Sequence, residues 1–178
     1  MCHSPTSESF IVTEQEQPAS VQEEFQQLRK SLKTLQIATL DSDGQPLASY
    51  APYVRLDQKY YLYLSELAKH TVNLIANGSV SLLLIESEEN CRNLFARRRI
   101  MLQGEARIIE RDLPLFTQVI AEFERQFGGI INVIEPLQDF HLFQIKPVSG
   151  RFIRGFAEAF KMSGPGLDVI EHISADKL

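Results

Sequence analysis

Short apolar segments, each bounded by turn residues, constrain what this chain can fold into more than any other feature. Residues 35–40 are followed by Asp41-Ser42-Asp43-Gly44, a sequence typical of a hairpin turn. Gly104 lies inside a longer segment and predicts a bend or bulge there. The predicted strands are 35–40, 47–55, 59–65, 79–85, 97–109, 140–146 and 151–156.

Amphipathic helices are expected between some of these strands, at 20–33, 66–77 and 112–127. In the second helix, Leu67, Leu74 and Ile75 are expected to face inward. A doubly wound sheet would place a helix after every strand, and this chain does not. The pattern therefore favours a mainly β protein, a small closed barrel with helical decoration.

The length of 178 residues predicts one domain, which we expect at 18–163. Residues 1–17 are polar and predict a flexible N-terminal tail; residues 164–178 predict a C-terminal tail with one helical turn. A net charge of -5 argues against nucleic acid as a partner. The longest apolar run, at 82–85, is too short to cross a membrane. Two isolated cysteines and no signal peptide indicate a cytoplasmic protein.

Several common catalytic motifs are absent from the sequence. It contains no glycine-rich phosphate loop and no G-x-S-x-G nucleophile motif. The four histidines are never closer than 31 positions, which does not suit a local metal site. An enzyme built on this chain would therefore depend on a bound cofactor for its chemistry.

The first candidate site is the segment 65–73, which leaves a strand and enters a helix. Ser65 is expected at the N-cap, where free backbone N–H groups favour an anion. Lys69, His70 and Asn73 could add donors to a phosphate or carboxylate. The alternative is a capped surface helix whose polar residues are simply solvated.

The second candidate is the run Arg97-Arg98-Arg99 at the start of a predicted strand. Alternate strand residues share a face, so Arg97 and Arg99 are expected ~6.6 Å apart on one side. Their guanidinium groups would suit the carboxylates or phosphate of a cofactor. The alternative is an edge strand that is kept soluble by its charge.

Two further candidates involve histidine. Asp139 and His141 fall on one face of a predicted strand, where a carboxylate could orient an imidazole of its own chain or of a partner. The alternative is an aspartate on a turn and a half-buried histidine. His172 lies in the predicted C-terminal tail and matters only if that tail folds over a pocket.

Several of these segments occur together in one known family. The sequence resembles the haem-utilisation proteins of the HutZ/HugZ type, in the pyridoxamine-phosphate-oxidase-like, FMN-binding split-barrel superfamily. The resemblance runs from about residue 25 to 163. It is carried by 33–39, 49–54, 68–74, 94–99, 137–140 and Gly155-Phe156, among which Leu-Phe-Ala-Arg and Leu-Gln-Asp-Phe are the blocks specific to the haem branch.

The resemblance implies an antiparallel split barrel that forms a homodimer, with the cofactor at the dimer interface. Arg99 would contact the haem edge or a propionate, and His70 matches a family histidine. Asp139 matches the aspartate that supports the axial histidine of the other protomer. The axial position itself falls near Asp176-Lys177, neither of which can replace imidazole, so His172 is the candidate iron ligand.

The expected function is haem binding and oxidative haem degradation that releases iron, with Asp139 and Arg99 as catalytic residues and His172, Arg97, Arg99 and His70 around the haem. This reaction needs O2 and an electron donor that the sequence does not identify. One alternative is an FMN-dependent oxidoreductase in which Ser65, Lys69, Thr71 and an arginine of the 97–99 run hold the FMN phosphate. The other is a split barrel that binds neither cofactor and acts as an interaction module.

Overall fold

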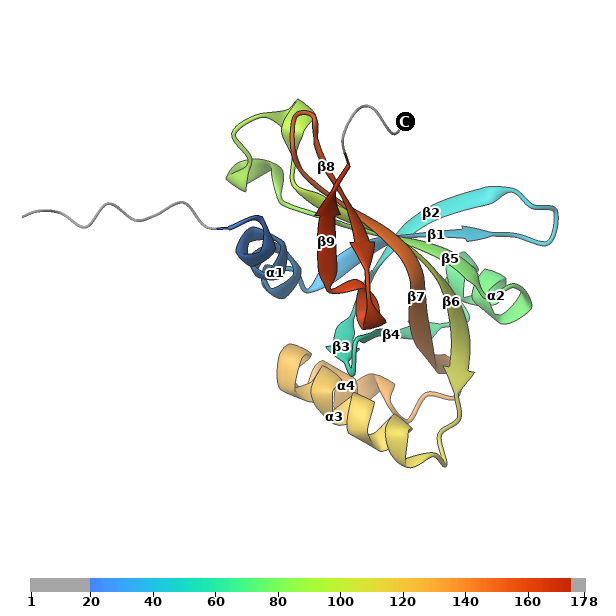
Figure 1. Ribbon diagram of the computed structural model, residues 1–178. Helices are drawn as coiled ribbons and strands as arrows, with labels where there is room; N and C mark the ends of the chain where they lie inside the picture. The colour runs from blue at the N-terminus through green and yellow to red at the C-terminus, as the bar shows by residue number, and fades with distance from the viewer. Residues whose placement is uncertain (1–19, 174–178) are drawn as a thin grey trace, which may run out of the picture.

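A single antiparallel sheet organises the computed structural model, which describes residues 20–173 (Figure 1). Its strands are β1 (Thr34–Leu40), β2 (Pro46–Pro52), β3 (Val54–Leu56), β4 (Lys59–Ser65), β5 (Ser79–Ile85), β6 (Arg99–Ile109), β7 (Phe140–Gly155), β8 (Glu158–Ser163) and β9 (Val169–His172). The order is β2-β1-β5-β6-β7-β4-β3, and β8 and β9 extend from β7. No hydrogen bonds join β2 to β3 within the described residues, so the sheet curves without closing. This is the split-barrel architecture that the family resemblance implies, and the closed barrel expected from the strand pattern is wrong because the two edge strands do not pair.

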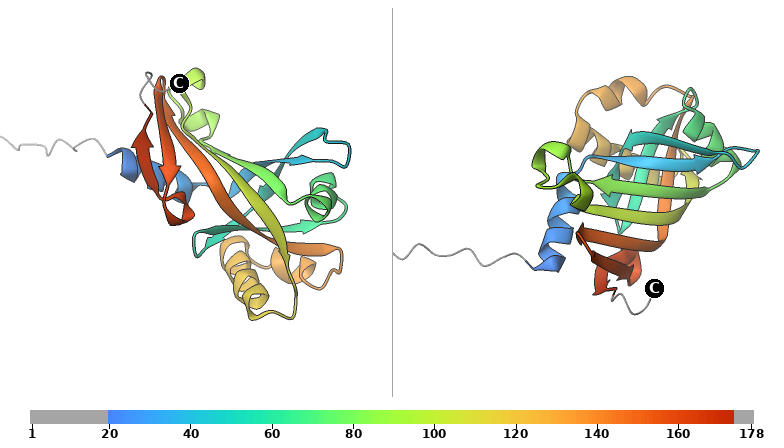
Figure 2. Two further views of the ribbon diagram at one scale, coloured as in Figure 1. Left: turned by 45° about the vertical axis from the view of Figure 1, so that its right-hand side comes forward. Right: turned by 90° about the horizontal axis from the view of Figure 1, so that it is seen from above.

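Helices flank the sheet rather than alternating with its strands (Figure 2). They are α1 (Val21–Ser31), α2 (Lys69–Ala76), α3 (Pro114–Phe127) and α4 (Ile130–Ile134), with 3-10 turns η1 (Glu88–Asn90), η2 (Leu94–Ala96) and η3 (Pro165–Leu167). α1 starts with a capping box, in which Ser20 and Glu23 satisfy each other's backbone N–H groups. None of the helices in residues 20–173 is long and apolar enough to cross a membrane.

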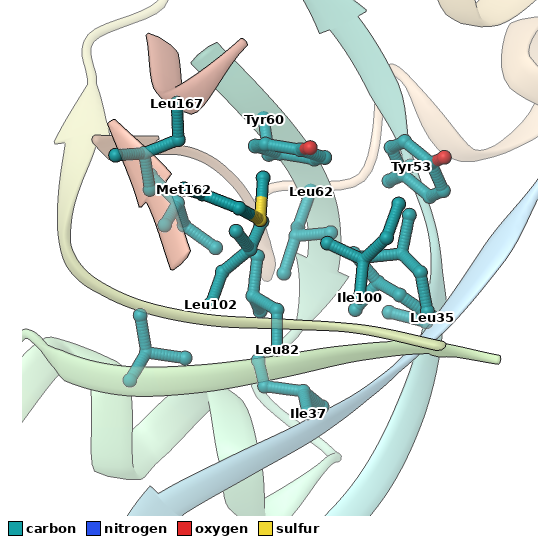
Figure 3. Close-up of a cluster of buried hydrophobic side chains, with 14 of the residues drawn as sticks. Leu35, Ile37, Tyr53, Tyr60, Leu62, Leu82, Ile100, Leu102, Met162 and Leu167 are labelled. Carbon is teal, nitrogen blue, oxygen red and sulfur yellow. The ribbon is translucent and has the colours of Figure 1, made fainter. Parts of the chain in front are cut away.

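Two hydrophobic clusters hold these layers together. The larger one fills the barrel and is closed at one end by Phe25 of α1, which packs against Phe152 of β7; Figure 3 shows part of it, from Leu35 and Ile37 to Met162 and Leu167. The smaller one lies between α3 and the sheet, where Tyr63 contacts aromatic side chains of α3. The two faces of β4 thus serve two cores, which explains why its residues 60–64 are all buried.

The structure confirms most of the predicted elements. The hairpin of β1 and β2 turns at residues 41–45, and β3 and β4 form the second hairpin. The two residues of that second turn, Asp57 and Gln58, both have positive φ, as a tight two-residue hairpin loop requires. The register of β6 and β7 shifts between Gln103 and Gly104, so the predicted bulge is present.

The two strands predicted at 140–146 and 151–156 form a single strand in the structure. β7 runs continuously from Phe140 to Gly155, whereas the sequence predicted a connection at 147–150. Pro147 is tolerated because it lies at the irregular point opposite Gly104. As a result, β7 and β6 form one long paired ribbon that spans the molecule.

The start of the second helix was predicted wrongly. α2 begins at Lys69 with Ala68 as its N-cap residue, because β4 extends through Ser65, which pairs with Phe140. Leu67, expected to face inward, is 95% exposed in the connection, and Ile75 is also exposed. Leu74 is buried as predicted.

Candidate functional site

An open cleft that combines cations with aromatic rings lies at one end of the β6–β7 ribbon. Arg99 enters it from the start of β6 and Arg151 from β7, on the face opposite the barrel core. Phe95 and Phe156 stand beside them and are 88% and 81% exposed. Exposed apolar patches of this kind are typical of surfaces that bind a ligand or another protein. The cleft has a volume of about 390 Å³ and is also lined by Ile153, Gly155, Ala157, Glu158, Ala159 and Ile173.

Among the three arginines at 97–99, Arg99 has a guanidinium that is available to a ligand in this cleft, whereas the other two are engaged by Glu86. Its Nη1 donates to the carbonyl of Arg97 at 3.0 Å, and among residues 20–173 no carboxylate pairs with it. Arg97, by contrast, donates through Nε and Nη2 to the carbonyl of Glu86. Arg98 donates to the carboxylate of buried Glu86 through its backbone N–H at 2.7 Å and its Nε at 2.8 Å.

The predicted sharing of one strand face by Arg97 and Arg99 is therefore not observed. β6 begins at Arg99, and Arg97 belongs to the preceding loop, where its guanidinium closes the loop against residues 86–88. Strand alternation cannot apply to a residue outside the strand. Arg97 thus has a bonding pattern typical of a structural residue.

His172 lies on β9, a strand that the sequence analysis assigned to a mobile C-terminal tail. Its ring stands edge-on to Phe160 at 5.2 Å between centroids, and its nitrogens have no hydrogen-bond partner among the described residues. It lines a second cavity of about 860 Å³, which shares Arg151 and Ile173 with the first. His172 pairs with Phe160, a core residue, so its imidazole lies on the face of β8–β9 opposite the one that carries Arg99 and Arg151.

Asp139 lies far from these residues within one chain. It immediately precedes β7, whose other end carries the cleft: Ile109 of β6 pairs with Leu142, and Arg99 pairs with Ile153. Its Oδ2 accepts a hydrogen bond from Ser65 Oγ at 2.6 Å. The Asp139 carboxylate and the imidazole of His172 could therefore meet only between two copies of the chain.

His141 is also engaged locally. Its Nε2 lies 2.5 Å from Oε1 of Glu66, in the connection between β4 and α2. The expected pairing of Asp139 with His141 is not formed, because Asp139 is bonded to Ser65 at the end of β4 and His141 to Glu66 in the connection that follows. The two side chains help to hold the start of β7 against the end of β4.

The polar residues of α2 point inward. His70, Thr71 and Asn73 are buried, whereas Lys69 is exposed. His70 Nδ1 lies 2.9 Å from Ser49 Oγ, and Asn73 donates to Thr39 Oγ1 at 3.0 Å. Burial removes water from the imidazole and lowers the pKa of His70.

This geometry does not assemble the anion cradle expected at 65–73. Ser65 is bonded to Asp139, and the Thr71 hydroxyl is buried with no partner among residues 20–173. His70 and Asn73 attach α2 to β1 and β2. Lys69 alone of these side chains is open to solvent.

The sequence did not point to Arg151, Phe95 or Phe156 as residues that line this cleft. Arg151 reaches the cleft only because β7 runs without interruption beside β6 and places it opposite Met101. The two phenylalanines lie in segments that the sequence analysis had used for a family resemblance, but their exposure was not predictable from spacing. No signal within a single segment brings these residues together, because the register of β6 and β7 does so.

Comparison with known proteins identifies the family of this chain. The pyridoxamine 5'-phosphate oxidase family model matches residues 21–154. The chain is 41% identical over 150 residues to a Vibrio cholerae protein named heme oxygenase HutZ, a match that covers 84% of this chain and 85% of that one. The chain belongs to the HutZ-type haem-utilisation branch of the pyridoxamine 5'-phosphate oxidase family.

Solved structures of the HutZ type share the fold. The crystal structure of Vibrio cholerae HutZ, described as a heme storage protein, superposes with a TM-score of 0.70 at 41% identity, over 74% of this chain and 92% of that one. Campylobacter jejuni ChuZ superposes with a TM-score of 0.78 at 30% identity. That match covers 88% of this chain and 63% of ChuZ. A Listeria innocua pyridoxamine 5'-phosphate oxidase homologue, 14% identical with a TM-score of 0.57, shares the fold alone.

Proposed function

We propose that this HutZ-type protein binds haem and degrades it oxidatively, with release of iron. The observation that carries the proposal is the open cleft of Arg99, Arg151, Phe95 and Phe156, in a chain 41% identical to a heme oxygenase. Haem is an apolar plate with two anionic propionates. Exposed rings match the plate, and two arginines without carboxylate partners among residues 20–173 match the propionates.

The chain's own residues would bind and orient this substrate. Arg99 and Arg151 would hold the propionates by charge-assisted hydrogen bonds, and Phe95 and Phe156 would cover the ring and exclude water. The imidazole of His172 has no hydrogen-bond partner among residues 20–173 and borders the second cavity from the other face of β9, and it is the candidate iron ligand. Haem itself supplies the iron and the ring that is opened, so the protein needs little acid–base machinery.

A homodimer would complete the site. Asp139 cannot reach His172 within one chain, because β7 separates them. In a symmetric pair, Asp139 of the partner subunit could accept a hydrogen bond from the imidazole of His172 and raise its basicity as a ligand. The outer face of β6–β9 carries both cavities, and we propose that the second subunit packs there.

Titration of the purified protein with haem and, separately, with FMN tests the proposal. We expect haem to produce a saturable Soret band near ~400 nm, which comes from the cofactor itself, and FMN to bind weakly or not at all. Saturable FMN binding without haem uptake would instead favour the flavin alternative. Uptake of neither would leave a non-catalytic interaction module and overturn the proposal.

A further inference from the structure

A cationic pocket lies on the sheet further along β6 and β7, towards α3. β4, β7 and β6 run side by side there, so Lys59, Lys146 and Arg107 reach one face (Figure 1). Together with Gln144, Glu105 and Ala106, they line a cavity of about 380 Å³. Arg99 and Arg151 do not line it, so the pocket is separate from the candidate haem cleft.

The guanidinium of Arg107 is held in place by a buried amide. Gln144 is 1% exposed, and its Oε1 accepts hydrogen bonds from Arg107 Nε at 2.9 Å and Nη2 at 2.6 Å. Its Nε2 donates to the Tyr61 hydroxyl at 2.8 Å. Burying an amide is costly unless it is fully hydrogen-bonded, and here those bonds fix one surface arginine. Nη1 of Arg107 has no hydrogen-bond partner among residues 20–173 and is available to a ligand.

The pocket carries positive charge that the protein does not neutralise. In residues 20–173, no carboxylate forms an ion pair with Lys59, Arg107 or Lys146. The side chains that line this cavity, three cations and the carboxylate of Glu105, sum to a charge of about +2, and the nearby carboxylate of Asp57, which acts on Tyr61, lowers the total to about +1. The chain as a whole has a net charge of -5, so this cavity is locally opposite in sign to the whole protein.

We infer that this pocket is a binding site for a small anion with a phosphate or pyrophosphate group. A positioned guanidinium combined with two compact ammonium charges suits a tetrahedral dianion, because the oxygens of such a group point in several directions. A flat carboxylate could use only one edge of the guanidinium and would leave the lysines unmatched. The site does not depend on the proposed haem chemistry.

Isothermal titration with pyrophosphate tests this site, with malonate as a dicarboxylate comparison. We expect pyrophosphate to bind at least about tenfold more tightly than malonate, and its affinity to fall steeply as NaCl is raised. Arg107→Gln and Lys146→Gln should each weaken pyrophosphate about tenfold, the effect of one lost charge-assisted interaction. Arg125→Gln, on the exposed surface of α3, is the matched control and should change nothing.

A second variant separates orientation from charge. Gln144→Met keeps every charge of the pocket but removes the amide that positions Arg107, so pyrophosphate affinity should fall several-fold while circular dichroism stays unchanged. The inference is overturned if wild-type protein binds no pyrophosphate, if binding is insensitive to salt, or if Arg107→Gln binds as well as Arg125→Gln.

Discussion

At the residue scale, Arg99 differs from its two neighbours in having no acidic partner in the described part of the chain. If it holds a propionate, Arg99→Ala should weaken haem binding by ~1.5–3 kcal/mol, the range of a charge-assisted hydrogen bond. Arg125→Ala, which removes an exposed arginine of α3, is the control in the same haem titration. Equal affinities of the two variants would remove Arg99 from the site.

The burial of His70 predicts that the free energy of unfolding depends on pH. Its pKa is lowered by burial, so the folded state prefers the neutral imidazole. As pH falls below about 6.5, the unfolded chain takes up this proton first, and the free energy of unfolding should decrease. His70→Gln keeps a polar partner for Ser49 but cannot titrate, so its urea midpoint should change less between pH 7.5 and pH 5. Identical pH slopes for the two proteins would contradict this.

At the element scale, Asp168, the residue before β9, connects the start of this strand to α1 and β3. This carboxylate pairs with Arg29 of α1, whose side chain is 8% exposed, and with Arg55 of β3 at 3.0 Å. Asp168→Asn should lower the free energy of unfolding by about 2 kcal/mol, because it leaves a nearly buried guanidinium without its anion and the pair is only partly screened. Asp43→Asn, in the exposed β1–β2 turn, is the control. Equal urea midpoints would show that the pair does not stabilise β9.

Local patterns predicted the elements that local contacts determine. The hairpin of β1 and β2 and the amphipathic α3 follow from turn residues and periodicity. The start of α2 could not be predicted, since Ser65 is kept in β4 by pairing with Phe140 from distant sequence. β9 is four residues long and exists through its pairing with β8.

The same distinction explains the candidate site. The arginine run made Arg97 and Arg99 equal candidates, and the family resemblance favoured Arg99; the absence of an acidic partner for Arg99 among residues 20–173 and the hydrogen bonds from Arg97 to the carbonyl of Glu86 depend on a loop conformation. Arg151 joins Arg99 through the register of a long antiparallel pair. Register is a non-local property, so sequence spacing within one segment does not reveal it.

At the scale of the whole molecule, a shared site predicts complementation between two defective chains. His172→Ala and Asp139→Asn should each slow haem turnover when alone. In a mixed dimer, one site would combine the intact His172 with the intact Asp139 of the partner subunit, so random mixing should restore about a quarter of wild-type turnover. Sedimentation should show a dimer at micromolar concentration. A monomer with haem bound, or no recovery on mixing, would contradict the shared site.

Opening of the haem ring frees its iron, so iron release distinguishes a protein that degrades haem from one that only holds it. One of the two HutZ descriptions names a heme oxygenase and the other a heme storage protein. An oxygenase destroys the ring of its bound haem, whereas a storage protein keeps the ring intact. Haem-loaded protein should be mixed with ascorbate and O2, and free iron measured with a ferrous chelator. The account predicts loss of the Soret band together with about one iron released per haem, as ring opening requires. A stable Soret band with no chelated iron would contradict it and leave a protein that only stores haem.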